Sequence, residues 1–227
     1  MRCTVQERPI LFNGEMVRAI LAARKTQTRR PCKPQPTAGF EPWFGCEDGY
    51  QFWIAHTCPP QLKTKAPDRT DHHGNYVTRC PFGRPGDRLW VREAYCPDWA
   101  DKLVYRADDP TGRGAREAGY AAEPKYRPSI HMPRWASRVT LEIGEIRVER
   151  LHDMTNSDAR SEGIFDDGDL VGPTARRLYG YASEFGWRQP KRAFAHMWNV
   201  TYAKRGLGWD ANPWVWVISF RPLEANS

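Results

Sequence analysis

The chain has 227 residues, of which 40% are hydrophobic and 12% aromatic, so it is long enough for one well-buried domain and too apolar to be disordered throughout. A formal net charge of +7 favours anionic partners, because a basic surface raises the local concentration of phosphates. The first residues lack the apolar run of a signal peptide and no stretch of about 18 apolar residues occurs, so we expect a cytoplasmic protein that does not enter a membrane.

The N-terminal part predicts one amphipathic helix. A short apolar run at 9–12 is followed by Asn13, a residue type suited to cap a helix, and then by GEMVRAILAA at 14–23. Apolar residues recur on one face of that helix, at Met16, Val17, Ile20 and Leu21. The helix should therefore deliver the residues from Lys25 to Thr28 at its C-terminal exit.

Residues from about 31 to 79 read as a long irregular insert, rich in proline and aromatic residues, with QFWIA at 51–55 as one expected strand. A zinc site that staples this insert is one hypothesis, although the sequence contains no C-x-x-C pair. Its candidate ligands are Cys32, Cys46, Cys58, Cys80, His72 and His73. We expect no cofactor and no catalytic metal.

Alternating apolar residues predict strands in the middle of the chain. RLWVREAY at 88–95 follows a Pro-Gly-Asp turn, and KLVYRAD at 102–108 is expected to be its neighbour. The strongest pattern is SRVTLEIGEIRVERL at 137–151, in which Gly144 interrupts the alternation. One long bent strand, or two strands, would satisfy that pattern.

The C-terminal third predicts helices and a final strand. DMTNSDARSEGI at 153–164 offers capping residues from Thr155 to Asp158 and would place Glu162 in the last turn of a short helix. PTARRLYGYASEF at 173–185 and PKRAFAHMWNVTY at 190–202 predict two more helices. NPWVWVISFRPL at 212–223 is apolar on both faces, which is typical of a strand in the middle of a core.

These elements together favour an α+β fold in a single domain over residues 1–227, built around a small β-barrel. The irregular insert would lie at about 31–79 and a helical insertion at about 173–200.

The stretch AARKTQTRR at 22–30 places hydroxyl groups among cations, and three interpretations stay open. The cations could simply complement a helix C-terminus. They could bind phosphates. Alternatively, Lys25 could be the base that deprotonates Thr28, for which its amine must be neutral. Moving a lysine pKa from about 10.4 to about 7 requires roughly 4.6 kcal/mol, which burial and nearby cations can supply. Spacing alone nominates no carboxylate to orient the amine.

The same stretch resembles the signature of the ASCH superfamily, whose PUA-like members carry a Gly-x-Lys-x-x-x-x-Arg motif after the first helix. Ala23, Lys25 and Arg30 occupy its three positions here. Since alanine lacks the freedom of glycine at positive φ, we expect the exit turn to differ. Further similarity to the larger ASCH-type proteins of bacteriophages and prophages runs through PILFNGEMVRAILAARKTQTRR, CPFGRPGDRLWVREAY, PSIHMPRWASRVTLEI, VERLHDM and WDANPWVWVISF.

The resemblance implies a PUA-like barrel. By similarity to small bacterial amidohydrolases that remove acyl groups from N4 of cytidine, it also implies a hydrolase of an N-acylated nucleoside or nucleic-acid base. Carried over by position, Thr28 would be the nucleophile, Lys25 its activator and Glu162 the acidic partner. Lys25 and Thr28 align without gaps, whereas Glu162 rests on matching DARSEGI to the equivalent helix.

Other ASCH-type relatives are ribonucleases or RNA-binding modules, which implies an alternative function. Single-stranded nucleic acid would then lie on the basic stretch, with Trp43, Trp53 or Trp90 offering a face for base stacking. The residues expected to contact a substrate or a nucleic acid are Arg24, Thr26, Arg29, Arg30, Trp90 and Arg92.

Overall fold

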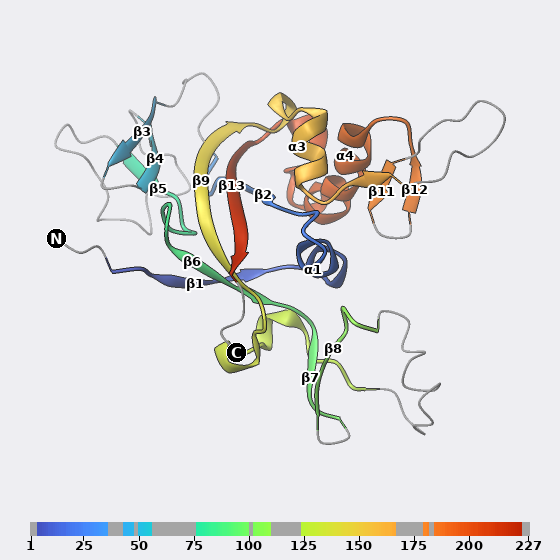
Figure 1. Cartoon of the computed structure of the whole chain (residues 1–227). Coiled ribbons are helices and arrows are strands. Elements are labelled where there is room, and N and C mark those ends of the chain that lie inside the picture. The colour runs from blue at the N-terminus through green and yellow to red at the C-terminus, as the bar shows by residue number, and fades with distance from the viewer. Residues whose placement is uncertain are drawn as a thin grey trace.

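A computed structural model describes residues 4–35, 43–47, 50–55, 76–99, 102–109, 124–166, 179–181 and 184–223. Its centre is a five-stranded sheet in the order β1-β6-β9-β13-β2, formed by β1 (Glu7–Leu11), β6 (Arg88–Arg92), β9 (Thr140–Arg150), β13 (Trp214–Leu223) and β2 (Gln27–Pro31). The β1 and β6 strands run parallel, and the other neighbouring strands are antiparallel. Figure 1 shows β9 and β13 as two long curved strands lying side by side.

Strand β13 is buried on both of its faces, as its unbroken apolar sequence predicted. Val215 and Val217 belong to a core cluster that also contains Phe194 of the C-terminal helix. Trp216 and Ile218 belong to a second cluster, on the opposite face of the sheet. The sheet therefore has a core on each side of β13, and both cores need its side chains.

The predicted interruption at Gly144 is the point where the register of β9 and β13 shifts. The shift lies between Ile218 and Phe220, and a Cβ atom on Gly144 would stand only 2.9 Å from Oγ of Ser219. That hydroxyl accepts a hydrogen bond from the backbone N–H of Glu145 at 2.6 Å. Glycine thus lets the two strands approach closely where the ladder bends.

The α+β class is as predicted, whereas a closed barrel is not seen among the described residues. Strands β1 and β2 are the two edges of the central sheet, and no backbone ladder described here joins them. The sheet is therefore open between these edges. Across the gap, Nη2 of Arg30 on β2 donates to the carbonyl of Leu11 on β1 at 2.6 Å.

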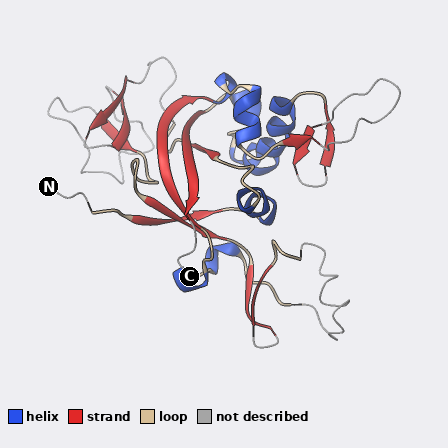
Figure 2. Cartoon of the chain, viewed as in Figure 1, coloured by secondary structure: helices blue, strands red, loops and turns tan. Residues whose placement is uncertain are grey.

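Three of the predicted helices are present. They are α1 (Gly14–Leu21), α3 (Asn156–Ser161) and α4 (Pro190–Tyr202). Asn13 caps α1 by accepting from the backbone N–H of Met16 at 2.8 Å, and Thr155 caps α3 through a capping box with Asp158. Figure 2 shows α3 and α4 grouped beside one edge of the sheet. Over the described ranges, no helix has the length and apolar character needed to cross a membrane.

The predicted helix at 173–185 is wrong where the structure describes it. Residues 179–181 form β11 (Tyr179–Tyr181) and residues 184–187 form β12 (Glu184–Trp187). The β11 strand lies in the middle of a small antiparallel sheet, between β12 and β10 (Phe165–Asp166). Tyrosines alternate around Gly180, a two-residue period that suits a strand. Among the described residues of the expected insertion at 173–200, helix begins at Pro190, and residues 173–178 and 182–183 lie outside the described residues.

Two further expectations need correction. The insert at 31–79 is not irregular throughout, because β3 (Trp43–Glu47), β4 (Tyr50–Ala55) and β5 (Tyr76–Arg79) form an antiparallel sheet. The strand expected at 51–55 is confirmed as β4. The segment at 102–108 contains β8 (Lys102–Tyr105), but β8 pairs with β7 (Tyr95–Trp99) and not with the strand at 88–92. It takes the partner that is nearest along the chain.

Candidate functional site

The turn after α1 directs Lys25 into the protein interior. Ala23 has φ 54°, in the left-handed region that favours glycine. Its N–H donates to the carbonyl of Ile20 at 2.9 Å, and the N–H of Arg24 donates to that of Ala19 at 2.8 Å. These two bonds make a Schellman motif. The expectation of a different exit turn is therefore wrong, because alanine adopts the conformation for which glycine is suited.

The short helix α3 ends in the same kind of turn and delivers Glu162. Gly163 has φ 99°, and its N–H donates to the carbonyl of Arg160 at 2.8 Å. The N–H of Ile164 reaches back to Ala159 at 3.2 Å. Glu162 is the last residue before this turn and forms an isolated antiparallel bridge with Lys25. Two helix ends thus present one cation and one carboxylate to each other.

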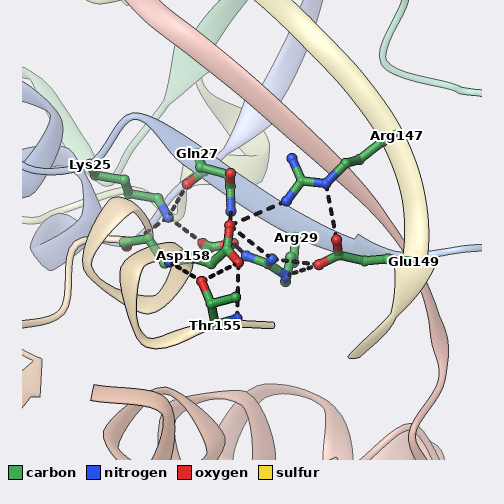
Figure 3. Close-up of polar contacts among 8 residues, drawn as sticks. Lys25, Gln27, Arg29, Arg147, Glu149, Thr155 and Asp158 are labelled. Atoms are coloured by element: carbon green, nitrogen blue, oxygen red, sulfur yellow. Dashed lines mark hydrogen bonds and ion pairs between the residues drawn. The ribbon is translucent and has the colours of Figure 1, made fainter. Parts of the chain in front are cut away.

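The buried ammonium group of Lys25 donates hydrogen bonds to three oxygen atoms (Figure 3). Nζ donates to the carbonyl of Gln27 at 2.9 Å, to the carbonyl of Glu162 at 2.9 Å and to Oε2 of Glu162 at 2.7 Å. The side chains of Lys25 and Glu162 are 0% and 2% exposed. Three acceptors match the three N–H groups of a charged lysine, so this arrangement holds the proton-bearing form.

Burial lowers the pKa of Lys25 below its ordinary value, because the interior disfavours the charged amine. The carboxylate of Glu162 opposes this shift through its charge and its hydrogen bond, while the nearby charges of Arg30 and Arg29 add to it. Burial and nearby cations were both expected to lower this pKa, and burial is the larger cause. The site therefore combines a desolvated lysine with a carboxylate that can share its proton.

Arg29 lies inside the same polar cluster, although it was expected at a phosphate-binding surface. It is 3% exposed, and its Nη1 donates to Oε1 of Glu162 at 3.3 Å. Its Nε donates to Oε1 of Glu149 at 3.0 Å, and Asp158 lies 3.5 Å from its Nη2. The guanidinium therefore holds the second carboxylate oxygen of Glu162 and is already paired with acidic groups.

Asp158 joins the helix cap to the ion network. Its Oδ1 accepts from Gln27 at 3.2 Å and from Arg147 at 3.2 Å, and its Oδ2 accepts from the backbone N–H of Thr155 at 2.9 Å. Partial burial acts to raise the pKa of Asp158, but the hydrogen bonds from Thr155 and Gln27 and the charge of Arg29 outweigh it and hold the pKa well below its usual range. Asp158 thus remains a carboxylate.

Sequence analysis did not identify the network residues on β9. Arg147 and Glu149 stand opposite Val217 and Val215, so they share one face of the sheet with Arg29. Nε of Arg147 donates to Oε2 of Glu149 at 3.0 Å. The available signal was two charged residues two positions apart in a predicted strand, because such a pair must share a face.

Thr28 lies on the opposite face of β2. It pairs with Ile218 of the core cluster that contains Phe12, and the Lys25 ammonium lies 5.6 Å from the centre of the Phe12 ring. Thr28 is 2% exposed, and within the described part of the chain its hydroxyl forms no hydrogen bond with Lys25 or Glu162. The structure thus brings Lys25 and Glu162 into direct contact and leaves Thr28 beside them, without a bond to either.

Two buried N–H donors on the Thr28 face of β2 and β13 have no acceptor among the described residues. They are Nε of Arg30 and Nε1 of Trp216, which face each other across β2 and β13. The other nitrogens of Arg30 donate to Leu11 and, at 3.4 Å, to the hydroxyl of Tyr202. A buried donor without an acceptor costs about 1–3 kcal/mol, so an acceptor oxygen beside either N–H would be stabilising.

The other expected contact residues divide between two places. Arg24 and Thr26 are exposed near α3, where the guanidinium of Arg24 lies 4.2 Å from the centre of the Phe165 ring. Trp90 and Arg92 lie on the outer face of β6, with the guanidinium of Arg92 5.4 Å from the Trp90 ring centre. The sequence did not single out Arg134, whose guanidinium lies 6.0 Å from the same ring. Trp90 and Arg92 are therefore separate from the Lys25 cluster.

The zinc hypothesis names six candidate ligands, and three of them lie outside the residues that the structure describes. Cys58, His72 and His73 lie outside the described residues, whereas Cys32 and Cys80 are buried free thiols of the core cluster around Phe12. Burial raises the pKa of Cys80 to about 12 and that of Cys32 well above its usual range. Within the described ranges, no three histidine, cysteine or carboxylate side chains gather as a metal site.

Comparison with known proteins adds no relative to this picture. The chain matches no protein-family model, no curated protein and no solved structure. The case for a function therefore rests on the residues and their geometry.

Proposed function

We propose that this chain is a hydrolase that removes an acyl group from an N-acylated cytosine-like base, with Lys25, Glu162 and Thr28 as its working residues. The observation that carries this proposal is the buried contact of 2.7 Å between Nζ of Lys25 and Oε2 of Glu162, three residues before a buried threonine. A desolvated lysine that can pass a proton to a carboxylate is what a threonine nucleophile requires.

The local geometry supports an ASCH-type, PUA-like assignment as part of the same proposal. The ASCH motif has glycine where this chain has Ala23, and Ala23 adopts the positive φ for which glycine is suited. Lys25 and Arg30 occupy the remaining motif positions, and both side chains lie within 6 Å of the Phe12 ring centre, at 5.6 and 5.2 Å. A bacteriophage or prophage origin belongs to the same proposal through this resemblance, and a cytoplasmic location is proposed with it.

The proposed reaction begins with a proton shift. The Nζ proton moves along the 2.7 Å hydrogen bond to Oε2 of Glu162, which leaves a free amine and a neutral carboxyl group. Burial favours the neutral amine of Lys25, and Nη1 of Arg29 donates a hydrogen bond to Oε1 of Glu162 on the other side of the carboxyl group. The Thr28 hydroxyl and the amine are not hydrogen-bonded at rest, so the next step requires the hydroxyl to move within reach of the amine.

The chemical steps follow acyl transfer. Thr28 Oγ1 attacks the acyl carbonyl as Lys25 takes the hydroxyl proton, and the tetrahedral adduct loses the base nitrogen, which receives that proton. The C–O bond to Thr28 forms and the C–N bond breaks. Water then attacks the threonine ester, giving the free acid and restoring the hydroxyl. Nε of Arg30 is a buried N–H without an acceptor among the described residues, and it supplies a donor for the oxyanion.

A second candidate function is a nucleic-acid-binding module or ribonuclease. It is favoured by Trp90, whose ring has the guanidinium groups of Arg92 and Arg134 at 5.4 and 6.0 Å from its centre. A half-buried tryptophan between cations suits a stacked base and its phosphates. This function needs no chemistry at Lys25.

The deciding experiment incubates the purified chain with N4-acetylcytidine and follows cytidine release by liquid chromatography. We expect turnover by the wild-type chain and a loss of at least about 100-fold in Thr28→Ala, because the nucleophile is removed. Thr28→Ser, which keeps a hydroxyl, serves as the matched variant and should retain part of the rate. Equal rates in the wild type and Thr28→Ala would exclude the proposed mechanism.

A further inference from the structure

The segment from Gly186 to Trp209 carries positive charge without any negative charge to balance it. It contains five cations and no aspartate or glutamate over 24 consecutive residues. The cations are Arg188, Lys191, Arg192, Lys204 and Arg205. In a chain with 27 acidic residues, this run places three of the five cations, Arg188, Lys191 and Arg192, at the start of α4, where they form a basic surface beside β12.

A groove opens at the start of this surface, where β12 meets α4. Its volume is about 390 Å³, and it is lined by Gly186, Trp187, Arg188, Gln189 and Arg192. This volume lies near the small end of the range for ligand sites, which suits a phosphate and its sugar more than a large ligand. Within the described ranges, neither Arg188 nor Arg192 has an ion-pair partner, so both guanidiniums are available to an anion.

The apolar face of α4 is already used by the fold. Phe194, Trp198 and Tyr202 are buried in the core cluster shared with β13, and Trp187 stacks on His196 with ring centres 4.7 Å apart. On α4 the exposed large apolar side chain is Val200 alone, which is less than the apolar stripe that a membrane-binding amphipathic helix needs. Charge alone would hold the ligand, which favours a nucleic-acid backbone over a membrane.

The groove is connected to the Lys25 site through α3. The backbone N–H of Lys191 donates to Oδ1 of Asn156 at 3.2 Å, and Asn156 is the first residue of α3. Glu162 follows the last residue of the same helix. Six helical residues span about 9 Å, so α3 links the chain beside the groove to Glu162 over a short distance.

We propose that the groove between β12 and α4 binds backbone phosphates of a single-stranded nucleic acid through Arg188 and Arg192. A statement about the substrate rests in addition on the hydrolase proposal. If that proposal holds, the enzyme acts on an acylated base within a polymer and not on a free nucleoside. Phosphate binding by the groove does not depend on that chemistry.

The test compares two double variants of the full chain that remove equal charge. Arg188→Ala/Arg192→Ala changes the groove, and Lys102→Ala/Lys125→Ala removes two exposed cations elsewhere. Binding of a fluorescent 12-nucleotide RNA is measured by anisotropy across a series of salt concentrations. Vesicles with anionic phospholipid and a free nucleoside monophosphate serve as competitors, and circular dichroism verifies that each variant folds.

We expect the groove variant to bind RNA at least about tenfold more weakly than the wild type. Its slope of log affinity against log salt should fall by about 1.4, since each phosphate contact with a single strand contributes roughly 0.7. The control variant should bind within about twofold of wild type. Equal loss in both variants, unchanged binding in the groove variant, or preferential competition by vesicles would each overturn the proposal.

A separate readout keeps this inference distinct from the hydrolase proposal. The groove variant should hydrolyse free N4-acetylcytidine at the wild-type rate, because Arg188 and Arg192 do not contact the Lys25 cluster in the described structure. If the wild-type chain hydrolyses N4-acetylcytidine and the groove variant binds RNA as tightly as wild type, the groove proposal is rejected and the hydrolase proposal stands. RNA binding that is lost in the groove variant, with no hydrolysis by the wild-type chain, would support the groove and reject the hydrolase.

Discussion

Nζ of Lys25 and Oε2 of Glu162 lie 2.7 Å apart although the two residues are separated by 137 positions in the chain. Both side chains are almost fully buried, so each charge has lost its water and depends on the other. Removing one partner from such a pair leaves an uncompensated charge in the interior, whereas removing both leaves neither charge of the pair there.

Lys25→Met should therefore lower the free energy of unfolding by about 3–5 kcal/mol, since Glu162 would lose its principal partner. The double variant Lys25→Met/Glu162→Leu should be destabilised by less than the sum of its single variants, with a coupling of roughly 1–3 kcal/mol. Urea denaturation of the four proteins measures this difference. Simple additivity would mean that the two groups do not interact in solution.

The activity of the proposed hydrolase should rise with pH through the lowered pKa of Lys25, because the free amine is the active form. Burial is the main cause of that shift. Between the lowered pKa and 10.5 the folded chain binds fewer protons than the unfolded chain, so the Lys25 contribution to stability also rises with pH. Lys25→Arg should abolish turnover at every pH, since a guanidinium is not a base there. Full hydrolysis by Lys25→Arg would disprove this role.

Ala23→Gly should stabilise the fold by about 1 kcal/mol, because glycine adopts the left-handed conformation without the Cβ penalty that alanine bears. Ala22→Gly is the matched control. Its φ is −87°, where glycine only adds freedom to the unfolded chain, so that change should destabilise by about 0.5–1 kcal/mol. Thermal unfolding compares the two, and the same sign for both would contradict the turn described here.

Asp158→Asn should lower stability at pH 7 by about 1–3 kcal/mol through loss of charge-assisted hydrogen bonds. Because the folded-state pKa of Asp158 is depressed, its contribution is present above the unfolded pKa of about 3.9 and is lost as pH falls below that value. The stability gap between wild type and variant should therefore narrow from pH 5 towards pH 2. A gap that stays constant over this range would assign the effect to packing.

Elements with a strong local signal could be predicted from the sequence. Asn13 capped α1 and Thr155 capped α3 because these side chains bond backbone groups within three residues. The alternation in β9 and the unbroken apolar run of β13 identified two neighbouring strands of the central sheet. Where the local pattern was mixed, as at 179–187, pairing with other strands overrode the helical reading.

The sequence by itself determined the residue types at the site, namely a lysine and a threonine three residues apart after a capped helix, and a glutamate at the end of a second one. Only the tertiary structure decided which of them meet. Two left-handed turns, at Ala23 and Gly163, set the directions from which Lys25 and Glu162 approach each other. The same packing buries Arg29. Contacts across 137 residues depend on how whole elements pack, and no local pattern encodes that packing.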